Sequence, residues 1–157
     1  MKLKPKFQSK SKFKDSRQAD VLLVYCSDFR FRKAFWEFQD AVLGKNRKID
    51  RVVVAGGHLS LLGSKYGYPN GDSAAKYWLK FLVKHHNIPE IVFVGHAGCA
   101  AYSSAKKLSG KTPLQLKEVQ AKDLARTKQL LGLRNIKIKL YFAEPDERER
   151  IRFSEVG

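Results

Sequence analysis

The sequence has no apolar segment that is long enough to cross a membrane. A transmembrane helix needs about 20 consecutive apolar residues, whereas the longest apolar run here, Val21–Tyr25, has the length of one strand. Residues 1–14 are dominated by lysine and lack the apolar core and the small-residue cleavage site of a secretory signal peptide. These absences predict a cytoplasmic protein without a membrane span.

Cysteine is scarce: the chain has two, Cys26 and Cys99. They could form a disulfide, but nothing in the sequence indicates an oxidising compartment. Intracellular cysteines that stand among histidine and aspartate more often serve a metal or catalysis. Both cysteines are therefore candidates for a functional site.

Acidic residues are few, 15 against 31 lysines and arginines, which gives a net charge of +16. Such a charge attracts polyanions, but no RNP-type motif, basic zipper or C2H2 spacing accompanies it. The composition thus favours weak, nonspecific polyanion binding. The lysines are most concentrated in residues 2–17, so we predict a basic flexible arm over 1–17 and a single α/β domain over 18–157.

The apolar pattern after residue 18 predicts alternating strands and helices. Strands are expected at Val21–Tyr25, Arg51–Ala55 and Ile91–Val94, with a long loop over Ser60–Gly71. One helix is expected before the second strand and another, capped by Asp72 or Ser73, before the third. The predicted inner face of the first helix consists of Phe31, Phe35, Phe38 and Val42, with Gly44 as its end, and that of the second of Ala74, Trp78, Phe81, Leu82 and His85.

The C-terminal third predicts one more helix and a final pair of strands. Thr112 and Gln115 form a capping box for a helix that runs to Gly132, and apolar residues alternate over 136–142 before a turn and a short partner strand around Ile151. The β-α-β-α-β order predicts right-handed crossovers. We therefore expect an α/β fold: a mainly parallel sheet of about four strands flanked by helices, with a C-terminal edge strand or hairpin.

Residues that bind metals follow two of the predicted strands. Cys26 comes directly after the first, and His96 and Cys99 follow the third in the sequence His96-Ala97-Gly98-Cys99. The carboxyl ends of parallel strands meet at one edge of a sheet, where ligand sites assemble. Two thiolates and an imidazole are donors that zinc prefers, and three protein ligands leave a fourth position for a water molecule.

The two motifs C-x-D-x-R, at Cys26–Arg30, and H-x-x-C, at His96–Cys99, resemble the signature of the β-class carbonic anhydrases. The resemblance extends over roughly Ala19 to Val156. It implies one zinc ion per chain on Cys26, His96 and Cys99, and a catalytic dyad of Asp28 and Arg30. It further implies reversible hydration of carbon dioxide to bicarbonate through a zinc-bound hydroxide, and a homodimer or larger assembly with the pocket near the subunit interface.

Several points stay open at this stage. In some members of that family the aspartate ligates the metal, so Asp28 is either a dyad partner or a fourth ligand. Phe29 stands where the family usually has serine, and either lines the pocket or packs. His58 follows the second strand and is either a proton shuttle, for which its pKa of about 6.5 is suitable, or a hydrogen-bonding loop residue. The alternative functions are hydrolysis of carbonyl sulfide or carbon disulfide, and a non-catalytic zinc protein whose basic arm binds polyanions.

Overall fold

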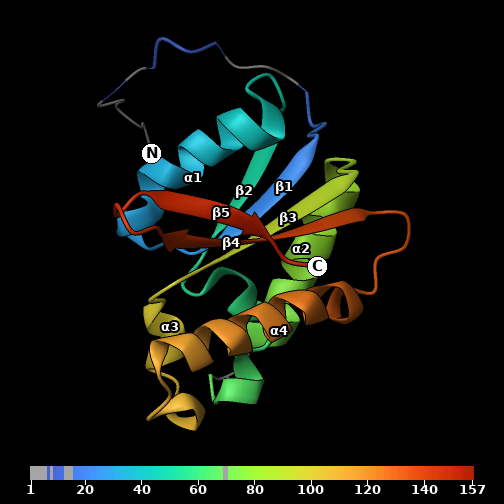
Figure 1. Cartoon of the computed structure of the whole chain (residues 1–157). Helices are drawn as coiled ribbons and strands as arrows, with labels where there is room; N and C mark the ends of the chain where they lie inside the picture. Colours follow the sequence, from blue (N-terminus) through green and yellow to red (C-terminus); the bar gives the residue numbers. More distant parts are fainter. Residues whose placement is uncertain (1–6, 8, 13–15, 69–70) are drawn as a thin grey trace.

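The computed structural model of the chain describes residues 7, 9–12, 16–68 and 71–157. It contains one five-stranded sheet in the order β2-β1-β3-β4-β5 (Figure 1). The first four strands are parallel and the fifth pairs antiparallel with β4, which confirms the predicted fold class. The strands are β1 (Val21–Tyr25), β2 (Ile49–Val53), β3 (Glu90–His96), β4 (Lys137–Pro145) and β5 (Ile151–Glu155).

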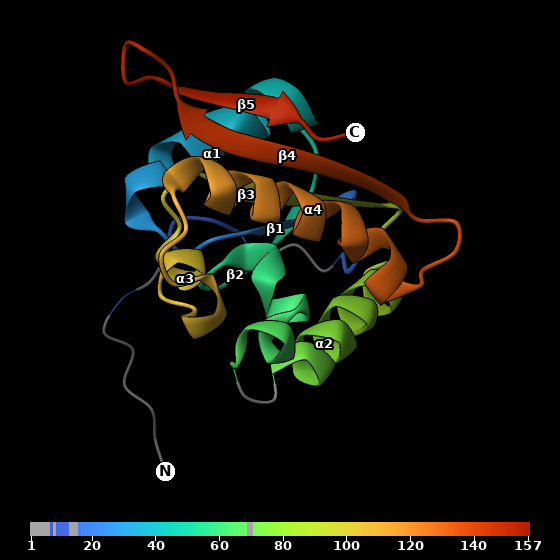
Figure 2. The same cartoon turned by 60° about the horizontal axis from the view of Figure 1, so that its bottom comes forward.

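Helices cover both faces of this sheet, as Figures 1 and 2 show. α1 (Arg32–Phe38) lies on one face, and α2 (Gly71–His85) and α4 (Pro113–Leu131) lie on the other. The loop expected over Ser60–Gly71 contains a short helical turn at Gly63–Tyr66, preceded by another at Gly57–Leu61. The remaining helical segments are Phe29–Phe31, Gln39–Gly44, α3 (Ala100–Ser103) and Lys106–Leu108.

The central strands are buried on both sides, which explains their continuous apolar sequences. Every residue of β1 and β3 is buried. Leu22, Val24 and Phe93 pack with α2 and α4, whereas Leu23 and Val92 pack with α1. The site that the sequence predicts therefore stands at the edge of a rigid, fully covered sheet.

The first helix differs from its prediction at its C-terminal end. Phe31, Phe35 and Phe38 are buried as expected, but Val42 is 51% exposed and Leu43 is buried instead. The reason is that Gln39–Gly44 forms a π-helical segment. Its hydrogen bonds span five residues instead of four, so the inward position after Phe38 moves from 42 to 43.

The face predicted for α2 is wrong in part: Leu82 packs against the core as expected, but the centre of the inner face lies elsewhere. Leu79 and Val83 are the buried residues of this helix, whereas Trp78 is 57% exposed. Asp72 lies inside the helix and accepts hydrogen bonds from the backbone N–H and the hydroxyl of Ser64. The aliphatic side chains of α2 thus face the sheet, and its aromatic side chains face outward.

The N-terminal cap of α4 is confirmed. The Thr112 side chain accepts from the Gln115 N–H at 3.3 Å, and the Gln115 side chain accepts from the Thr112 N–H at 2.9 Å. Of the arm predicted over 1–17, residues 1–6, 8 and 13–15 lie outside the described residues. Within the part of the chain that the structure describes, no helix is both long and apolar enough to cross a membrane.

Candidate metal centre

The order of the strands places the candidate site at a reversal in the winding of the sheet. The chain passes from β1 to β2 on one side, and then crosses back to β3 on the other side of β1. Right-handed crossovers then put α1 and α2 on opposite faces, which opens a crevice at the carboxyl ends of β1 and β3. Cys26 follows β1 directly, and His96 is the last residue of β3.

The structure brings the three predicted metal ligands together. The donor atoms of Cys26, His96 and Cys99 all lie within 4.8 Å of one another, and the three residues are buried. Gly98 allows the turn between His96 and Cys99 because its φ of +65° suits glycine best. Cys99 then precedes the short helix α3, and its own backbone is extended.

The geometry of the donors fits a tetrahedral metal ion. The two sulfur atoms are 3.9 Å apart, and two thiolates on one tetrahedral zinc, with Zn–S bonds of about 2.3 Å, would be separated by about 3.8 Å. The Nδ1 atom of His96 is 2.9 Å from the Ala97 carbonyl, which fixes the proton on Nδ1. The buried Nε2 atom has no hydrogen-bond partner among the described residues, so its lone pair is available to a metal.

The surroundings of the two thiols favour one thiolate. The hydrogen bond from the Cys99 thiol lowers the pKa of Cys26 well below its ordinary value, and the hydrogen bond from the Gly56 N–H acts in the same direction against the effect of burial. The same contact with Cys26, together with burial, raises the pKa of Cys99. Both cysteines are free.

Asp28 and Arg30 form the expected pair. Nη2 of Arg30 donates to Oδ2 of Asp28 at 2.6 Å, and Nε donates to Oδ1 at 3.0 Å. These hydrogen bonds lower the pKa of the Asp28 carboxyl group, which stays ionised. Nη2 also donates to the Gly98 carbonyl at 2.9 Å, and thereby joins the loop after β1 to the loop that carries Cys99.

Phe29 and His58, the two less specific candidates, occupy opposite environments. Phe29 is 81% exposed in the single chain. His58 is fully buried, and burial lowers its pKa to about 4. Without solvent contact it cannot pass a proton directly to bulk water, and its position agrees with the alternative role as a hydrogen-bonding residue.

His58 belongs to a buried polar network that the sequence did not reveal. Its Nε2 atom is 2.8 Å from the hydroxyl of Tyr102, which lies 3.3 Å from the carboxylate of Asp123. Asp123 has no exposed surface, and Tyr66 and Lys65 also donate to it. Asp123 is one of three buried polar residues of α4, with Gln120 and Thr127, so only its spacing on the buried side of that helix could have indicated its role.

Phe31 also contacts the site, although the sequence suggested only a core role. Its ring packs on the His96 imidazole with 4.4 Å between the ring centres, and it is buried. It therefore helps to fix the plane of the ligand ring. The first residue of the predicted helix face is thus also a neighbour of the metal donors.

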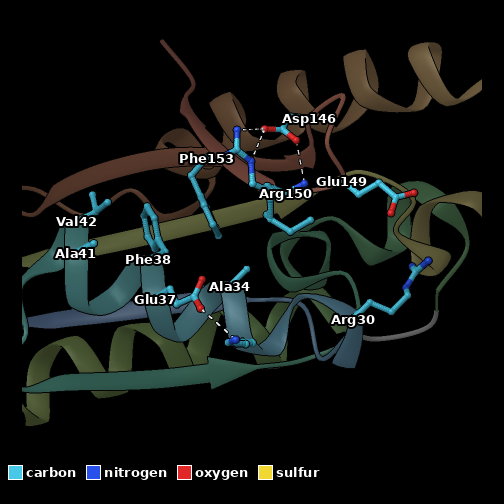
Figure 3. Close-up of a pocket in the computed structure, with 12 residues that line it drawn as sticks. Arg30, Ala34, Glu37, Phe38, Ala41, Val42, Asp146, Glu149, Arg150 and Phe153 are labelled. Carbon is cyan, nitrogen blue, oxygen red and sulfur yellow. Dashed lines mark hydrogen bonds and ion pairs between the residues drawn. The ribbon is translucent and has the colours of Figure 1, made fainter.

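Two hollows lie near these residues. An apolar cavity of about 430 Å³ is lined partly by Val54 and Ala55, which follow β2, and by Ala100 and Ala101, which follow Cys99. A larger groove of about 820 Å³ separates α1 from the β4–β5 turn and β5 (Figure 3). Arg30 lies at the edge of that groove, but none of the three metal donors lines it.

Comparison of the sequence with known proteins gives relatives without a known function. No family model matches the chain. An uncharacterized protein of Rickettsia conorii is 33% identical over 110 residues, and one of Rickettsia bellii is 32% identical over 110 residues. Each alignment includes 70% of this chain but only 56% and 63%, respectively, of the two relatives.

Comparison with solved structures identifies the fold. A β-carbonic anhydrase of Trichomonas vaginalis superimposes with a TM-score of 0.56 and 16% identity, over 95% of this chain and 89% of that one. A tetrameric β-carbonic anhydrase of Sordaria macrospora gives 0.54 and 15%, over 89% and 82%. The enzyme CafA of Aspergillus fumigatus gives 0.54 and 13%, over 89% and 77%. The chain therefore has the β-carbonic anhydrase fold, with a cluster of cysteine and histidine donors that could hold a metal.

Proposed function

We propose that the chain is a zinc enzyme that catalyses the reversible hydration of carbon dioxide to bicarbonate and a proton. The observation that carries this proposal is the convergence of Cys26, His96 and Cys99, with donor atoms within 4.8 Å, beside the paired Asp28 and Arg30. One zinc ion per chain is the metal that this donor set suits best. The fold supports the proposal but does not by itself fix the reaction.

Zinc, when bound to these three residues, supplies Lewis-acid chemistry that lowers the pKa of a coordinated water from about 15.7 towards 7. The chain supplies orientation. The ionised Asp28 carboxylate has no proton to donate, so it can only accept a hydrogen bond from the attacking water. That hydrogen bond turns an oxygen lone pair towards the substrate carbon.

Arg30 is the positioning residue in this arrangement. Its two-pronged contact fixes the plane of the Asp28 carboxylate, and its third hydrogen bond, to the Gly98 carbonyl, ties that carboxylate to the loop of Cys99. Because Asp28 is held by Arg30, we assign it to the dyad and not to the metal. The apolar cavity beside Ala100 is suited to a small substrate without charge, such as carbon dioxide.

Zinc analysis combined with stopped-flow hydration of carbon dioxide tests the proposal. The wild type should contain about one zinc per chain and hydrate carbon dioxide, and Cys99→Ser should lose both properties. Arg30→Gln should keep zinc but lose most of the activity, because only the orientation of Asp28 changes. Phe29→Ser, at an exposed position, is a matched control in the same loop and should keep the metal.

Full zinc content without hydration would contradict the proposal. The zinc-loaded protein would then be assayed with carbonyl sulfide and carbon disulfide, which are also linear and electrophilic. A homodimer or larger assembly and a cytoplasmic location belong to the same proposal. Sedimentation of the zinc-loaded protein and fractionation of cells test these two parts separately.

A further inference from the structure

The outer face of α2 carries a continuous group of aromatic side chains, which we call the aromatic face: Tyr77, Trp78, Phe81 and His85. Tyr77 is 60% exposed and Trp78 is 57% exposed. The ring centres of Trp78 and Phe81 are 5.6 Å apart, and the Phe81 and His85 rings stack at 4.0 Å. Exposed apolar groups that form one patch mark an interaction surface more often than isolated ones.

A row of lysines runs beside the aromatic face. Lys76, Lys80 and Lys84 recur at every fourth position, so they share one side of the helix next to the rings. The sequence from Ser73 to Pro89 contains no aspartate or glutamate. Among the residues that the structure describes, none lies within ion-pair distance of these three lysines. The lysine row is therefore a positive surface without a compensating charge.

We infer that the aromatic face and the lysine row form a binding site for single-stranded nucleic acid. Unpaired bases stack on exposed aromatic rings whatever their sequence, and lysines beside them neutralise the phosphates. The net charge of +16 would speed the approach of such a partner. Paired bases offer no free faces to the rings, so duplexes should bind more weakly.

Charge and composition argue against two other occupants. A two-fold contact between copies of this face would bring two lysine rows together without an acidic residue between them, which is unfavourable. A helix that binds to a membrane surface buries a whole apolar face of tryptophan, phenylalanine and leucine in the lipid. On α2 the aliphatic part of such a face, Leu79 and Val83, is already buried in the protein core. The outward groups are flat rings, and three of them, those of Tyr77, Trp78 and His85, carry polar atoms.

The two tryptophans of the chain permit a direct test. Trp36, on α1, is 60% exposed, so it matches Trp78 in exposure but lies on the opposite face of the sheet. Trp36→Phe leaves Trp78 as the only tryptophan, and Trp78→Phe leaves Trp36. An unlabelled oligo(dT) should quench the fluorescence of the Trp36→Phe protein and leave that of the Trp78→Phe protein unchanged.

Fluorescence anisotropy with a labelled oligo(dT) then measures affinity. Trp78→Ala should weaken binding by about 5- to 150-fold, the range for loss of one stacked base, whereas Trp36→Ala should leave it unchanged. A plot of log affinity against log salt should become less steep by about 0.7 when Lys80 is replaced by glutamine, because one phosphate contact is lost. Urea denaturation of each variant verifies that the fold is retained.

Four results would overturn the inference. The first is equal quenching of the fluorescence of both single-tryptophan proteins by oligo(dT). The second is complete loss of oligonucleotide binding when residues 1–17 are deleted. The third is that the protein binds anionic lipid vesicles through Trp78 but does not bind the oligonucleotide. The fourth is dissociation of an oligomer by Trp78→Ala without any oligonucleotide binding by the wild type. None of these results depends on carbon dioxide hydration, so the inference and the proposed function can fail independently.

Discussion

His58 should make a separable contribution to the loss of stability of the folded chain on acidification. Its imidazole is fully buried, and burial lowers its pKa to about 4 from an ordinary value of 6.5. Its Nδ1 atom has no hydrogen-bond partner among the described residues, and its Nε2 atom contacts the hydroxyl of Tyr102. The nearby Asp123 carboxylate acts in the opposite direction, but desolvation is the larger effect.

The sign and size of the effect follow from proton linkage. Because the folded-state pKa is the lower one, the unfolded chain takes up a proton first as the pH falls below 6.5, and the free energy of unfolding decreases. At about 1.4 kcal/mol per pKa unit, the difference between 6.5 and about 4 corresponds to at most about 3 kcal/mol. The expected loss is about 2 kcal/mol at pH 5 and about 3 kcal/mol at pH 4.

Urea denaturation of the wild type and of His58→Gln, at pH 7 and pH 5, measures this loss. Glutamine cannot be protonated in this range, so the variant should lose about 2 kcal/mol less than the wild type on going to pH 5. Protonation of the groups other than His58 affects both proteins equally and cancels in the comparison. His85→Gln, which changes an exposed histidine, should respond to pH as the wild type does.

Parallel stability curves for the wild type and His58→Gln would refute the reasoning, because His58 would then be protonated in the folded chain. Magnetic resonance of the imidazole provides an independent measurement: its chemical shifts should stay at their neutral values down to pH 5. The same burial bears on catalysis. A histidine that is neutral and without solvent contact at pH 7 should be dispensable for hydration, so His58→Gln should keep a rate close to that of the wild type.

Four further substitutions, one of them a control, test the packing of α1, the loop after β2 and the dyad. Phe35→Ala should lower the free energy of unfolding by about 3–5 kcal/mol because Phe35 is fully buried. Trp36→Ala, the control, should change it by less than about 0.5 kcal/mol. If urea denaturation gave similar losses for the two variants, the observed packing of α1 would be contradicted. Gly57→Ala would place a methyl group 3.0 Å from the Tyr25 carbonyl carbon at a φ of +54°, and should weaken zinc binding in competition with a chelator. Arg30→Lys should reduce the hydration rate by about 100-fold with normal zinc content, and wild-type activity would show that charge alone is sufficient.

The sheet and the three metal donors could be predicted because each depends on local sequence. A strand buried on both faces is a continuous apolar run, as at Val21–Tyr25 and Ile91–Val94, and the direction of a crossover is almost always right-handed. The buried-strand pattern and the right-handed crossover together place the residues after β1 and β3 at the same edge of the sheet, where the carboxyl ends of the parallel strands meet. The order of β1 and β3 in the sheet then brings Cys26 to His96, although they are far apart in the sequence.

Which residues of α1 and α2 face the core could not be predicted in the same way. Hydrophobicity alone does not distinguish Val42 from Leu43, and the π-helical segment that selects Leu43 depends on backbone hydrogen bonds. In α2 the rings have the larger apolar surface, yet Leu79 and Val83 face the sheet.

The buried network around Asp123 escaped prediction for a different reason. A carboxylate in the middle of a helix normally faces solvent, and nothing in the flanking residues of α4 marks this one as buried. Its partners Lys65, Tyr66 and Tyr102 come from two other segments of the chain. Only the folded arrangement reveals that a charge can be buried here, because these partners satisfy its hydrogen bonds.

The Asp28–Arg30 pair is fixed by directed hydrogen bonds and is only partly buried. The effect of replacing Arg30 depends on this difference. The Arg30 side chain is 54% exposed, and the Asp28 side chain is 12% exposed. An ion pair with one partner in water contributes little to stability, so replacing Arg30 should hardly change the unfolding curve. Its hydrogen bonds nevertheless fix Asp28 and reach Gly98, two residues from His96 and one from Cys99. Substitution should therefore affect the orientation of the carboxylate, and hence the reaction rate, much more than the stability of the fold.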